Sequence, residues 1–251
     1  MVASNFIKPS QNKATRIQML HEMFDQIKGT TVLLEELQPD PKNYNFDSAD
    51  IRKEHAFKTL IATMLSVRSK DETTLKVIEN LWKHYDTPQK LAYAPLEHVE
   101  QLIHSSGTYR QKAKRIIEAS RIIHEEYNDE VPPSQEKLMK IKGVGRKVAN
   151  CVLVVSFNIP VIPVDTHVHR ISNRTGWVTT NSPEKTEFAL EKAFPKSEWL
   201  VINYTLVSFG KMICKPIGPK CDMCVVNDRC MKRIVIAPKK QKKVKKNFSK
   251  S

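Results

Sequence analysis

Four cysteines stand within seventeen residues near the end of the chain, in the segment CKPIGPKCDMCVVNDRC from 214 to 230. Their spacing, C-x6-C-x2-C-x5-C, contains one closely spaced pair, whereas a zinc site usually combines two such pairs. Four thiolates at unequal spacing suit a [4Fe-4S] cluster, which needs four cysteine sulfurs. The pattern therefore favours an iron–sulfur cluster over zinc, with Cys214, Cys221, Cys224 and Cys230 as its ligands.

Disulfide bonds are the alternative use of clustered cysteines. They belong to oxidising compartments and small secreted domains, while this chain has 251 residues and an odd total of five cysteines. It also shows no N-terminal apolar segment typical of a signal peptide and no apolar run near the roughly eighteen residues that would span a membrane. We therefore expect an intracellular protein. The fifth cysteine, Cys151, lies in the run NCVLVV and is expected to be a small buried residue.

The segment KLMKIKGVGRKVANC, 137 to 151, places two glycines one residue apart between two helical stretches. Such a turn exposes backbone amides beside a helix N-terminus and can bind an anion. The alternative is a plain turn between helices with no ligand. Arg146 and Lys147 begin the second helix, where the helix dipole disfavours cations. We therefore expect these two side chains to face phosphate or to take part in chemistry.

Asp165 follows the apolar segment VIPV and precedes the helical run THVHRISNR. A carboxylate here is a good N-cap for the helix that begins near Thr166, and capping is the simplest interpretation of the residue. His167 and His169 are interpreted as packing or surface histidines, because no further ligand completes a metal set around them.

The chain is strongly basic, with 41 Lys+Arg against 27 Asp+Glu and a formal net charge of +14. This balance indicates a polyanionic partner, first nucleic acid and second an anionic membrane surface. Half of the net charge lies in the lysine-rich tail 236–251, which we expect to be disordered. The rest of the chain is also basic, so the body of the protein favours a polyanion as well.

Apolar residues recur at steps of three and four along much of the chain, which predicts an all-α fold. Three helix starts are indicated by capping residues next to proline, at Thr87-Pro88, Pro133-Ser134 and Ser182-Pro183. The run VLVVSF, 152 to 157, has the β-branched content of a buried strand. Because it continues an apolar stretch from Val148, we predict that it finishes a helix.

Over roughly residues 56 to 230 the sequence resembles the endonuclease III family of helix-hairpin-helix DNA glycosylases. The resemblance rests on FKTLIATMLSVRSKD, SSGTYRQKAKRII, IKGVGRKVANCVL, VDTHVHRISNRTGWV and the cysteine spacing, in this order. It implies an all-α, two-lobed fold with a C-terminal [4Fe-4S] cluster loop and with DNA across the cleft between the lobes. We expect four parts: an N-terminal helix and connection at 1–50 that packs with the cluster lobe, a helical bundle with the hairpin at 51–160, a lobe with the catalytic Asp and the iron–sulfur cluster at 161–235, and the basic tail.

The resemblance also implies site residues and a reaction. Lys147 is the nucleophile, with its pKa lowered by desolvation and by the helix N-terminus, and Asp165 is the catalytic carboxylate. Gly143, Val144 and Gly145 grip a phosphate through backbone amides. The implied partner is double-stranded DNA containing damaged bases or abasic sites, bound by a monomer. The implied compartment is the cytoplasm and nucleoid of a prokaryote or the nucleus of a eukaryote.

The chain departs from the family pattern at three places. Lys142 stands where proline is common before the hairpin. Arg68 takes the place of a glutamine that fills the gap left by the flipped base, and Thr108 replaces a larger apolar wedge. Two lysines of the loop KPIGPK, Lys215 and Lys220, are expected to meet phosphate. The departures leave open which lesion and which opposite base are preferred.

Three functions compete at this point. The first is a bifunctional glycosylase and AP lyase that acts on oxidised pyrimidines. The second is a monofunctional mismatch or adenine glycosylase of the same fold, and the third is a non-catalytic DNA-binding module. Lys147 and Ala62 favour the first function, because the monofunctional relatives lack the lysine and the adenine enzymes have a glutamate at the place of Ala62.

Overall fold

The computed structural model describes residues 11–28 and 49–232. Within these residues the fold is built from α-helices and two short 3₁₀ turns, without a strand, which confirms the all-α prediction. The helices are α1 Lys13–Ile27, α3 Ala49–Ser66, α4 Asp71–Trp82, α5 Pro88–Ala92, α6 Leu96–Leu102, α7 Tyr109–Tyr127, α8 Gln135–Lys140, α9 Arg146–Phe157, α10 Thr166–Thr175, α11 Pro183–Ala193 and α12 Trp199–Met212; the turns are Lys196–Glu198 and Cys221–Met223. The predicted basic tail, 236–251, lies outside the described residues.

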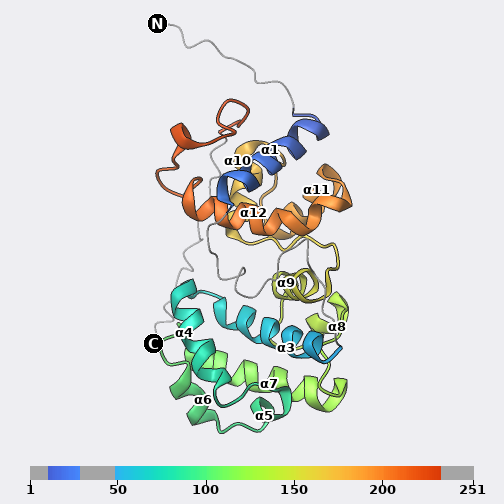
Figure 1. The fold of residues 1–251 in the computed structure, drawn as a ribbon, viewed down its shortest axis with the longest axis vertical. Coiled ribbons are helices and arrows are strands. Elements are labelled where there is room, and N and C mark those ends of the chain that lie inside the picture. Colours follow the sequence, from blue (N-terminus) through green and yellow to red (C-terminus); the bar gives the residue numbers. More distant parts are fainter. Residues whose placement is uncertain (1–10, 29–48, 233–251) are drawn as a thin grey trace, which may run out of the picture.

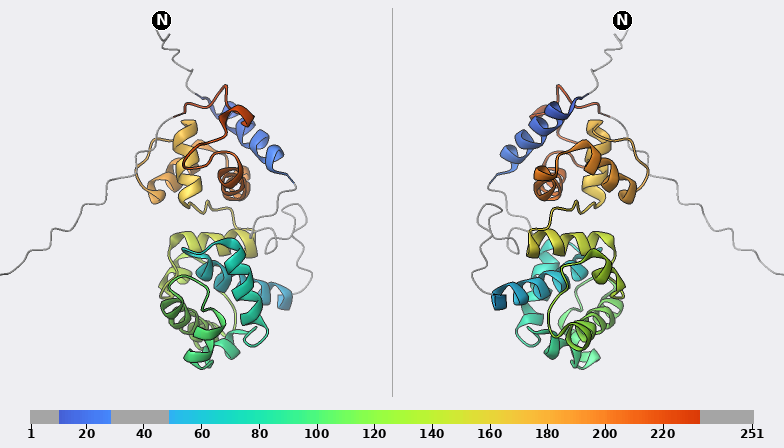
Figure 2. Two further views of the ribbon diagram at one scale, coloured as in Figure 1. Left: turned by 90° about the vertical axis from the view of Figure 1, so that its left-hand side faces the viewer. Right: turned by 90° about the vertical axis from the view of Figure 1, so that its right-hand side faces the viewer.

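The helices form two lobes, one above the other in Figure 1. The lower lobe comprises α3 to α9, and the upper lobe comprises α1, α10 to α12 and the cysteine-rich loop. The side views in Figure 2 show the same division, with α9 on the side of the lower lobe that faces the upper lobe. The first described helix, α1, and the last described segment, the cysteine-rich loop, both belong to the upper lobe. The two ends of the described chain therefore lie in the same lobe.

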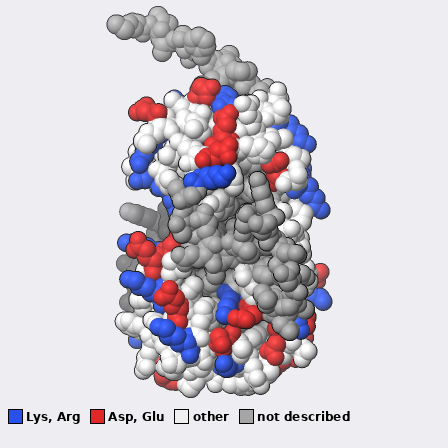
Figure 3. Space-filling view, in the orientation of Figure 1, with Lys and Arg blue, Asp and Glu red and all other residues white. Residues whose placement is uncertain are grey.

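The surface in the orientation of Figure 1 has no continuous patch of one charge. On the described part of this face, Lys and Arg side chains are interspersed with Asp and Glu side chains over both lobes (Figure 3). A polyanion such as DNA is attracted to concentrated positive charge rather than to a mixed surface. The described part of this face therefore has no concentrated positive charge of the kind that attracts DNA.

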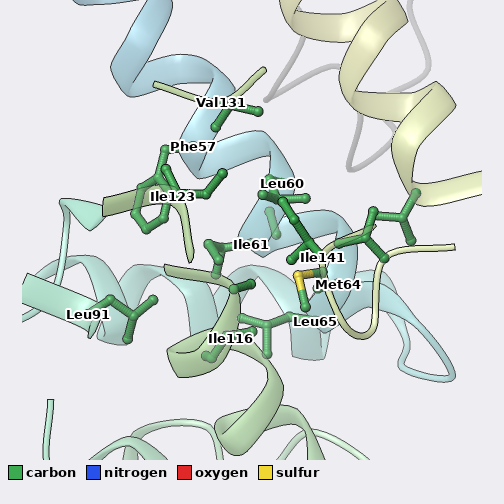
Figure 4. Packing of buried hydrophobic residues seen from close by; sticks show 14 of the residues in the cluster. Phe57, Leu60, Ile61, Met64, Leu65, Leu91, Ile116, Ile123, Val131 and Ile141 are labelled. Carbon is green, nitrogen blue, oxygen red and sulfur yellow. The ribbon is translucent and has the colours of Figure 1, made fainter. Parts of the chain in front are cut away.

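Each lobe has its own hydrophobic core. In the lower lobe, α3 contributes Phe57, Leu60 and Leu65, which pack with Ile116 of α7 and with residues of α9 (Figure 4). In the upper lobe, the core is formed by α1, α10, α11 and α12 together with Val226 of the cysteine-rich loop. Burying a side chain of this size stabilises the fold by about 1.5–3 kcal/mol. The two cores are therefore sufficient to fix the two lobes as separate bodies that meet at α9.

The predicted helix starts are confirmed. The side chains of Thr87, Ser134 and Ser182 accept hydrogen bonds from backbone amides in the first turns of α5, α8 and α11. The run 152–157 is helical and completes α9, as predicted, and its residues Val152 to Ser156 are buried. Its β-branched side chains are tolerated in a helix because burial against α3 outweighs their modest helix propensity.

A buried carboxylate connects the lobes. Glu187 of α11 has a side chain only 4% exposed, and its Oε1 accepts hydrogen bonds from Arg146 Nη1 at 3.2 Å and from Asn150 Nδ2 at 3.0 Å. Gln135 of α8 completes the network by accepting from Arg146 Nη1 at 3.1 Å and donating to Asn150 Oδ1. The network thus ties the hairpin of the lower lobe to a helix of the upper lobe.

We expect the Glu187→Ala variant to lose about 3 kcal/mol of unfolding free energy, the lower end of the range for breaking a buried ion pair, because Arg146 keeps some contact with solvent. Urea unfolding followed by circular dichroism measures this change. Glu184→Ala, an exposed carboxylate in the first turn of the same helix, is the control and should cost less than about 1 kcal/mol. Equal losses for the two variants would show that the network does not hold the lobes together.

Candidate active site

The hairpin between α8 and α9 exposes the start of a helix. Gly143 has φ of +92°, a conformation that side chains rarely adopt. Val144 anchors the turn, since its side chain is buried and its amide donates to Ile141 O at 3.0 Å. Gly145 is the N-cap of α9 and provides no side chain to cap it. The amides of the first turn of α9 are therefore directed out of the turn, as in an anion-binding helix terminus.

Lys147 and Asp165 line one cavity of about 570 Å³ between the lobes. Lys147 is the second residue of α9, and Asp165 is the N-cap of α10, so each lobe provides one of the two side chains. Asp165 Oδ1 accepts from the amides of His167 at 2.8 Å and Val168 at 2.9 Å. The predicted capping role of Asp165 is thus confirmed, and capping fixes the carboxylate at the wall of the cavity.

The protonation of Lys147 depends on its neighbours. Its pKa is raised, most strongly by Cys151 one helical turn later and further by Asp165, while burial of the ammonium opposes this. Burial also raises the pKa of the Cys151 thiol. The expectation that burial and the helix N-terminus lower the pKa of Lys147 was wrong, because it left out Cys151 and Asp165, which together outweigh the burial.

Two further residues of the cavity were missed by the sequence analysis. Asp71, in the first turn of α4, and Lys211, in the last turn of α12, form an ion pair between the lobes and both line the cavity. An acidic residue is common in the first turn of a helix and a basic residue in the last turn. The local sequence therefore did not indicate a functional role for either residue. Only the pairing of residues 140 positions apart in the chain brings them to the site.

Arg68 and Thr108 lie together beside the cavity. Both are non-glycine residues in the left-handed region, with φ of +57° and +59°. They line a second cavity of about 280 Å³ together with Gly143, and Arg68 also lines the first. Three predicted DNA contacts from three different segments therefore meet at one cavity of the lower lobe, which adjoins the larger cavity at Arg68.

Arg146 is placed differently from the other predicted DNA contacts. Its guanidinium is engaged by Gln135 and Glu187, as described above, and lies over the ring of Phe188 at 5.3 Å. These contacts hold the guanidinium in place between the two lobes. A phosphate contact by Arg146 therefore stays a prediction.

The four clustered cysteines line a separate cavity of about 360 Å³ in the upper lobe. All four are free of disulfide bonds and are partly buried. Arg174 of α10 donates to Cys214 Sγ at 3.5 Å and to Lys215 O at 2.7 Å, which holds the start of the loop against α10. The side chains of Lys215 and Lys220 are exposed on this loop. Cys151 is buried in α9, far along the chain from this group, as predicted.

None of the described helices is both long enough and apolar enough to cross a membrane. His169 has the packing role that was predicted for it, since its Nδ1 forms a hydrogen bond of 2.6 Å with Thr186 Oγ1. His167 lines the cavity, and burial lowers its pKa. At neutral pH we therefore treat this imidazole as uncharged.

Comparison with known proteins identifies the family. Residues 61–196 match the family model of the HhH-GPD superfamily base excision DNA repair protein. The chain is 53% identical over 174 residues to the endonuclease III of Thermotoga maritima. This match covers 69% of this chain and 82% of that protein. It is 38% identical over 205 residues, or 78% of this chain, to the chloroplastic endonuclease III homolog 2 of Arabidopsis thaliana, and it spans about half (53%) of that protein's length.

Solved structures give the same result. A trapped endonuclease III–DNA covalent intermediate matches with a TM-score of 0.75 at 34% identity, over 88% of this chain and 97% of that chain. A non-covalent endonuclease III–DNA complex matches with a TM-score of 0.75 at 34% identity, over 88% and 96%. A thermostable thymine-DNA glycosylase, 20% identical, shares the fold with a TM-score of 0.71 over 87% of this chain and 95% of that one. With its hairpin, its facing lysine and carboxylate and its four-cysteine loop, this chain belongs to the endonuclease III family of the HhH-GPD superfamily of base excision DNA repair proteins.

Proposed function

We propose that this protein is a bifunctional DNA N-glycosylase and AP lyase that removes oxidised pyrimidines from duplex DNA and nicks the strand. The observation that supports it most is that the amine of Lys147 and the carboxylate of Asp165 face one cavity from opposite lobes. A glycosylase without lyase activity has no need of a buried amine beside the carboxylate, and a DNA-binding module needs neither. A protein that acts on duplex DNA must be located where the DNA is. This compartment is the nucleoid region of the cytoplasm in a prokaryote or the nucleus in a eukaryote.

The DNA is held at the mouth of the cleft. The amides of Gly143 and Gly145 bind one phosphate at the start of α9, while the Val144 amide, which donates to Ile141 O, fixes the turn between them. The exposed Lys215 and Lys220 contact the DNA backbone further along. Arg68 and Thr108 enter the duplex at the place that the damaged nucleotide leaves. Flipping the base out of the stack costs a few kcal/mol, and less for a lesion that already stacks poorly. The cavity of about 570 Å³ is large enough to receive the flipped base.

The amine of Lys147 then attacks C1′ of the sugar as the N-glycosidic bond breaks and the base departs with the bonding electrons. The ammonium must first lose a proton, and Asp165 is the acceptor that faces it. In the covalent product the lone pair of the lysine nitrogen forms a C1′=N bond as the C1′–O4′ bond breaks. The O4′ atom keeps the electron pair of that bond and takes up a proton, which leaves an open-chain protonated imine. The imine acidifies a C2′ hydrogen, whose removal expels the 3′ phosphate and nicks the strand.

Asp165 serves the reaction through its charge. Both capping amides reach Oδ1, so that Oδ2 is the oxygen available to the substrate. A carboxylate that faces the sugar stabilises the positive charge that develops on it as the base leaves. Capping fixes the orientation of the carboxylate, because both amides bind the same oxygen.

We propose that the four cysteines hold a [4Fe-4S] cluster. Their thiols surround one cavity of about 360 Å³, which a cluster of several atoms suits better than a single ion. Among the described residues, no three His, Cys, Asp or Glu side chains are grouped closely enough to hold one metal ion. When bound, the cluster fixes the path of the loop, and through Arg174 this loop is attached to the helix that Asp165 caps.

The lyase function predicts a defined product. On a duplex with thymine glycol or an abasic site, the wild-type protein should leave a strand nicked by β-elimination. Lys147→Ala should stop the nicking while much of the DNA binding remains, because phosphate contacts provide most of the affinity. Lys192→Ala, an exposed lysine of α11, is the control and should cleave normally. Denaturing gel electrophoresis measures the nick, and base release without a nick by the wild-type protein would support the monofunctional alternative.

Two substitutions of Asp165 should separate its capping role from its catalytic role. Asp165→Asn keeps the oxygen that accepts from the two amides, so its unfolding free energy should stay near that of the wild type, while base removal slows by about 10²-fold or more. Asp165→Ala should lose the cap as well, at a cost of about 1 kcal/mol. Single-turnover excision and urea unfolding give the two quantities. Equal excision by the wild type and the Asn variant would leave Asp165 with capping alone.

The purified protein should be yellow-brown and contain iron and acid-labile sulfide at about four each per chain. Cys221→Ser should lower both contents and the stability of the upper lobe, because the ligands also fix the chain path. Cys151→Ser lies outside the loop and should keep its iron. About one zinc per chain with no visible absorbance would contradict the cluster.

A further inference from the structure

Lys112 is a buried lysine that the mechanism above does not use. It lies on α7 with 5% of its surface exposed, on the same face as Ile116 and Ser120, which are fully buried. A lysine at this position of an apolar face is unusual. The sequence analysis missed it, although its i, i+4, i+8 spacing with those two residues was visible.

Its ammonium has three partners, all neutral oxygen atoms. Lys112 Nζ donates to Leu65 O at 2.6 Å, to Ser106 Oγ at 2.7 Å and to Ser69 Oγ at 2.8 Å. The three bonds use all three protons of the ammonium. The side chain is thus fully bonded even though no carboxylate balances its charge in these contacts.

The three acceptors come from two neighbouring parts of the chain. Leu65 lies in the last turn of α3 and Ser69 in the loop that follows it, and Ser106 lies in the loop that enters α7. The loops also touch directly, because Ser69 Oγ and Ser106 Oγ are 3.1 Å apart. A side chain added at Gly107 would come within 3.2 Å of the carbonyl oxygen of Arg68. Lys112 therefore stands at the point where the two loops are bound together.

Each of these loops presents one left-handed residue to the cleft. Arg68 is adjacent to Ser69, and Thr108 follows Ser106 by two positions. Non-glycine residues in this conformation persist only where the surrounding contacts hold them. The ammonium of Lys112 provides such contacts on both sides, so one buried group supports both strained residues.

We infer that Lys112 is a positioning residue that joins the two loops into one unit, so that Arg68 and Thr108 enter the duplex together when a base leaves the stack. This inference rests on the proposed function, because it concerns how that enzyme opens its DNA. Lys112 does not touch the substrate itself. It acts by fixing the backbone of the two residues that do.

The protonation of Lys112 agrees with this role. Burial lowers its pKa to about 8. The other charged residues that line the adjoining cavity are the cations Arg68 and Arg115. As pH rises through about 8, the ammonium loses a proton and one of its three hydrogen bonds. The joint between the loops is therefore complete below this pH and weakened above it.

The test compares a substrate that must be opened with one that is already open. Lys112→Met keeps the length of the side chain and removes its donors, and Ser106→Ala is a milder variant that removes one acceptor. Lys114→Met, on the exposed face of the same helix, is the matched control. The substrates are a thymine-glycol duplex, for base excision, and a single-stranded oligonucleotide with an abasic site, for strand cleavage under single-turnover conditions.

Lys112→Met should slow excision from the duplex by about tenfold or more, as expected for misplaced positioning groups, and Ser106→Ala by less. Both should cleave the single strand at the wild-type rate, which also shows that they are folded. The ratio of the duplex rate to the single-strand rate should fall between pH 7 and 9 for the wild type and stay constant for Lys112→Met.

Three results would overturn the inference: unchanged duplex excision by Lys112→Met, an equal loss on both substrates, or an equal loss in the Lys114→Met control. Wild-type protein that cleaves neither substrate would instead contradict the proposed function, and the inference with it. The two failures are therefore distinguished by the behaviour of the wild-type protein.

Discussion

The arrangement of the site depends on one buried carboxylate. Glu187 of the upper lobe receives hydrogen bonds from Arg146 and Asn150, which lie on either side of Lys147 on α9. Because α9 also packs against α3 in the lower core, its N-terminus is held from both sides. Together with the ion pair between Asp71 and Lys211, this network fixes the start of α9 relative to the lobe that contains Asp165. An ion pair in this position contributes more through orientation than through net stability.

A second chain of contacts runs from Asp165 to the cysteine-rich loop. Asp165 caps the start of α10, and Arg170 and Arg174 of the same helix bind the carbonyl oxygen of Cys214 and its sulfur, respectively. Arg170 also binds Gly210 O at 3.2 Å, and a side chain at Gly210 would come within 2.9 Å of its guanidinium. The cysteine-rich loop, the last turn of α12 and the carboxylate are thus connected through hydrogen bonds to one helix, α10. If the four cysteines hold a cluster as proposed, these contacts connect it to the carboxylate without giving it a part in a reaction step.

The sequence was sufficient for the local features of the fold and site. The all-α class, the caps at Thr87, Ser134 and Ser182 and the capping role of Asp165 follow from interactions within a few residues, and all are present. The exposed hairpin at Gly143 was likewise visible as two glycines between helical stretches. Features of this kind are encoded by neighbours along the chain.

The parts that escaped prediction involve distant segments. The contact of Arg146 with Glu187, 41 positions later, was not predicted. The pair of Asp71 and Lys211 spans 140 positions, and Lys112 reaches Leu65 across 47. The spacing of apolar residues shows which face of each helix is buried. It does not show which other element packs against that face. The raised pKa of Lys147 has one contribution of this kind, from Asp165 of the other lobe, after a larger one from Cys151 on its own helix.

Two lysines, Lys147 and Lys211, line the cavity between the lobes, and the account assigns the covalent step to the first of them. The most direct measurement is borohydride reduction during turnover on a duplex with an abasic site, followed by protease digestion and mass spectrometry of the adduct. An amine nucleophile forms an imine that borohydride converts to a stable bond. The account predicts the sugar remnant on Lys147. A remnant on Lys211, or the absence of any adduct while bases are still released, would contradict it.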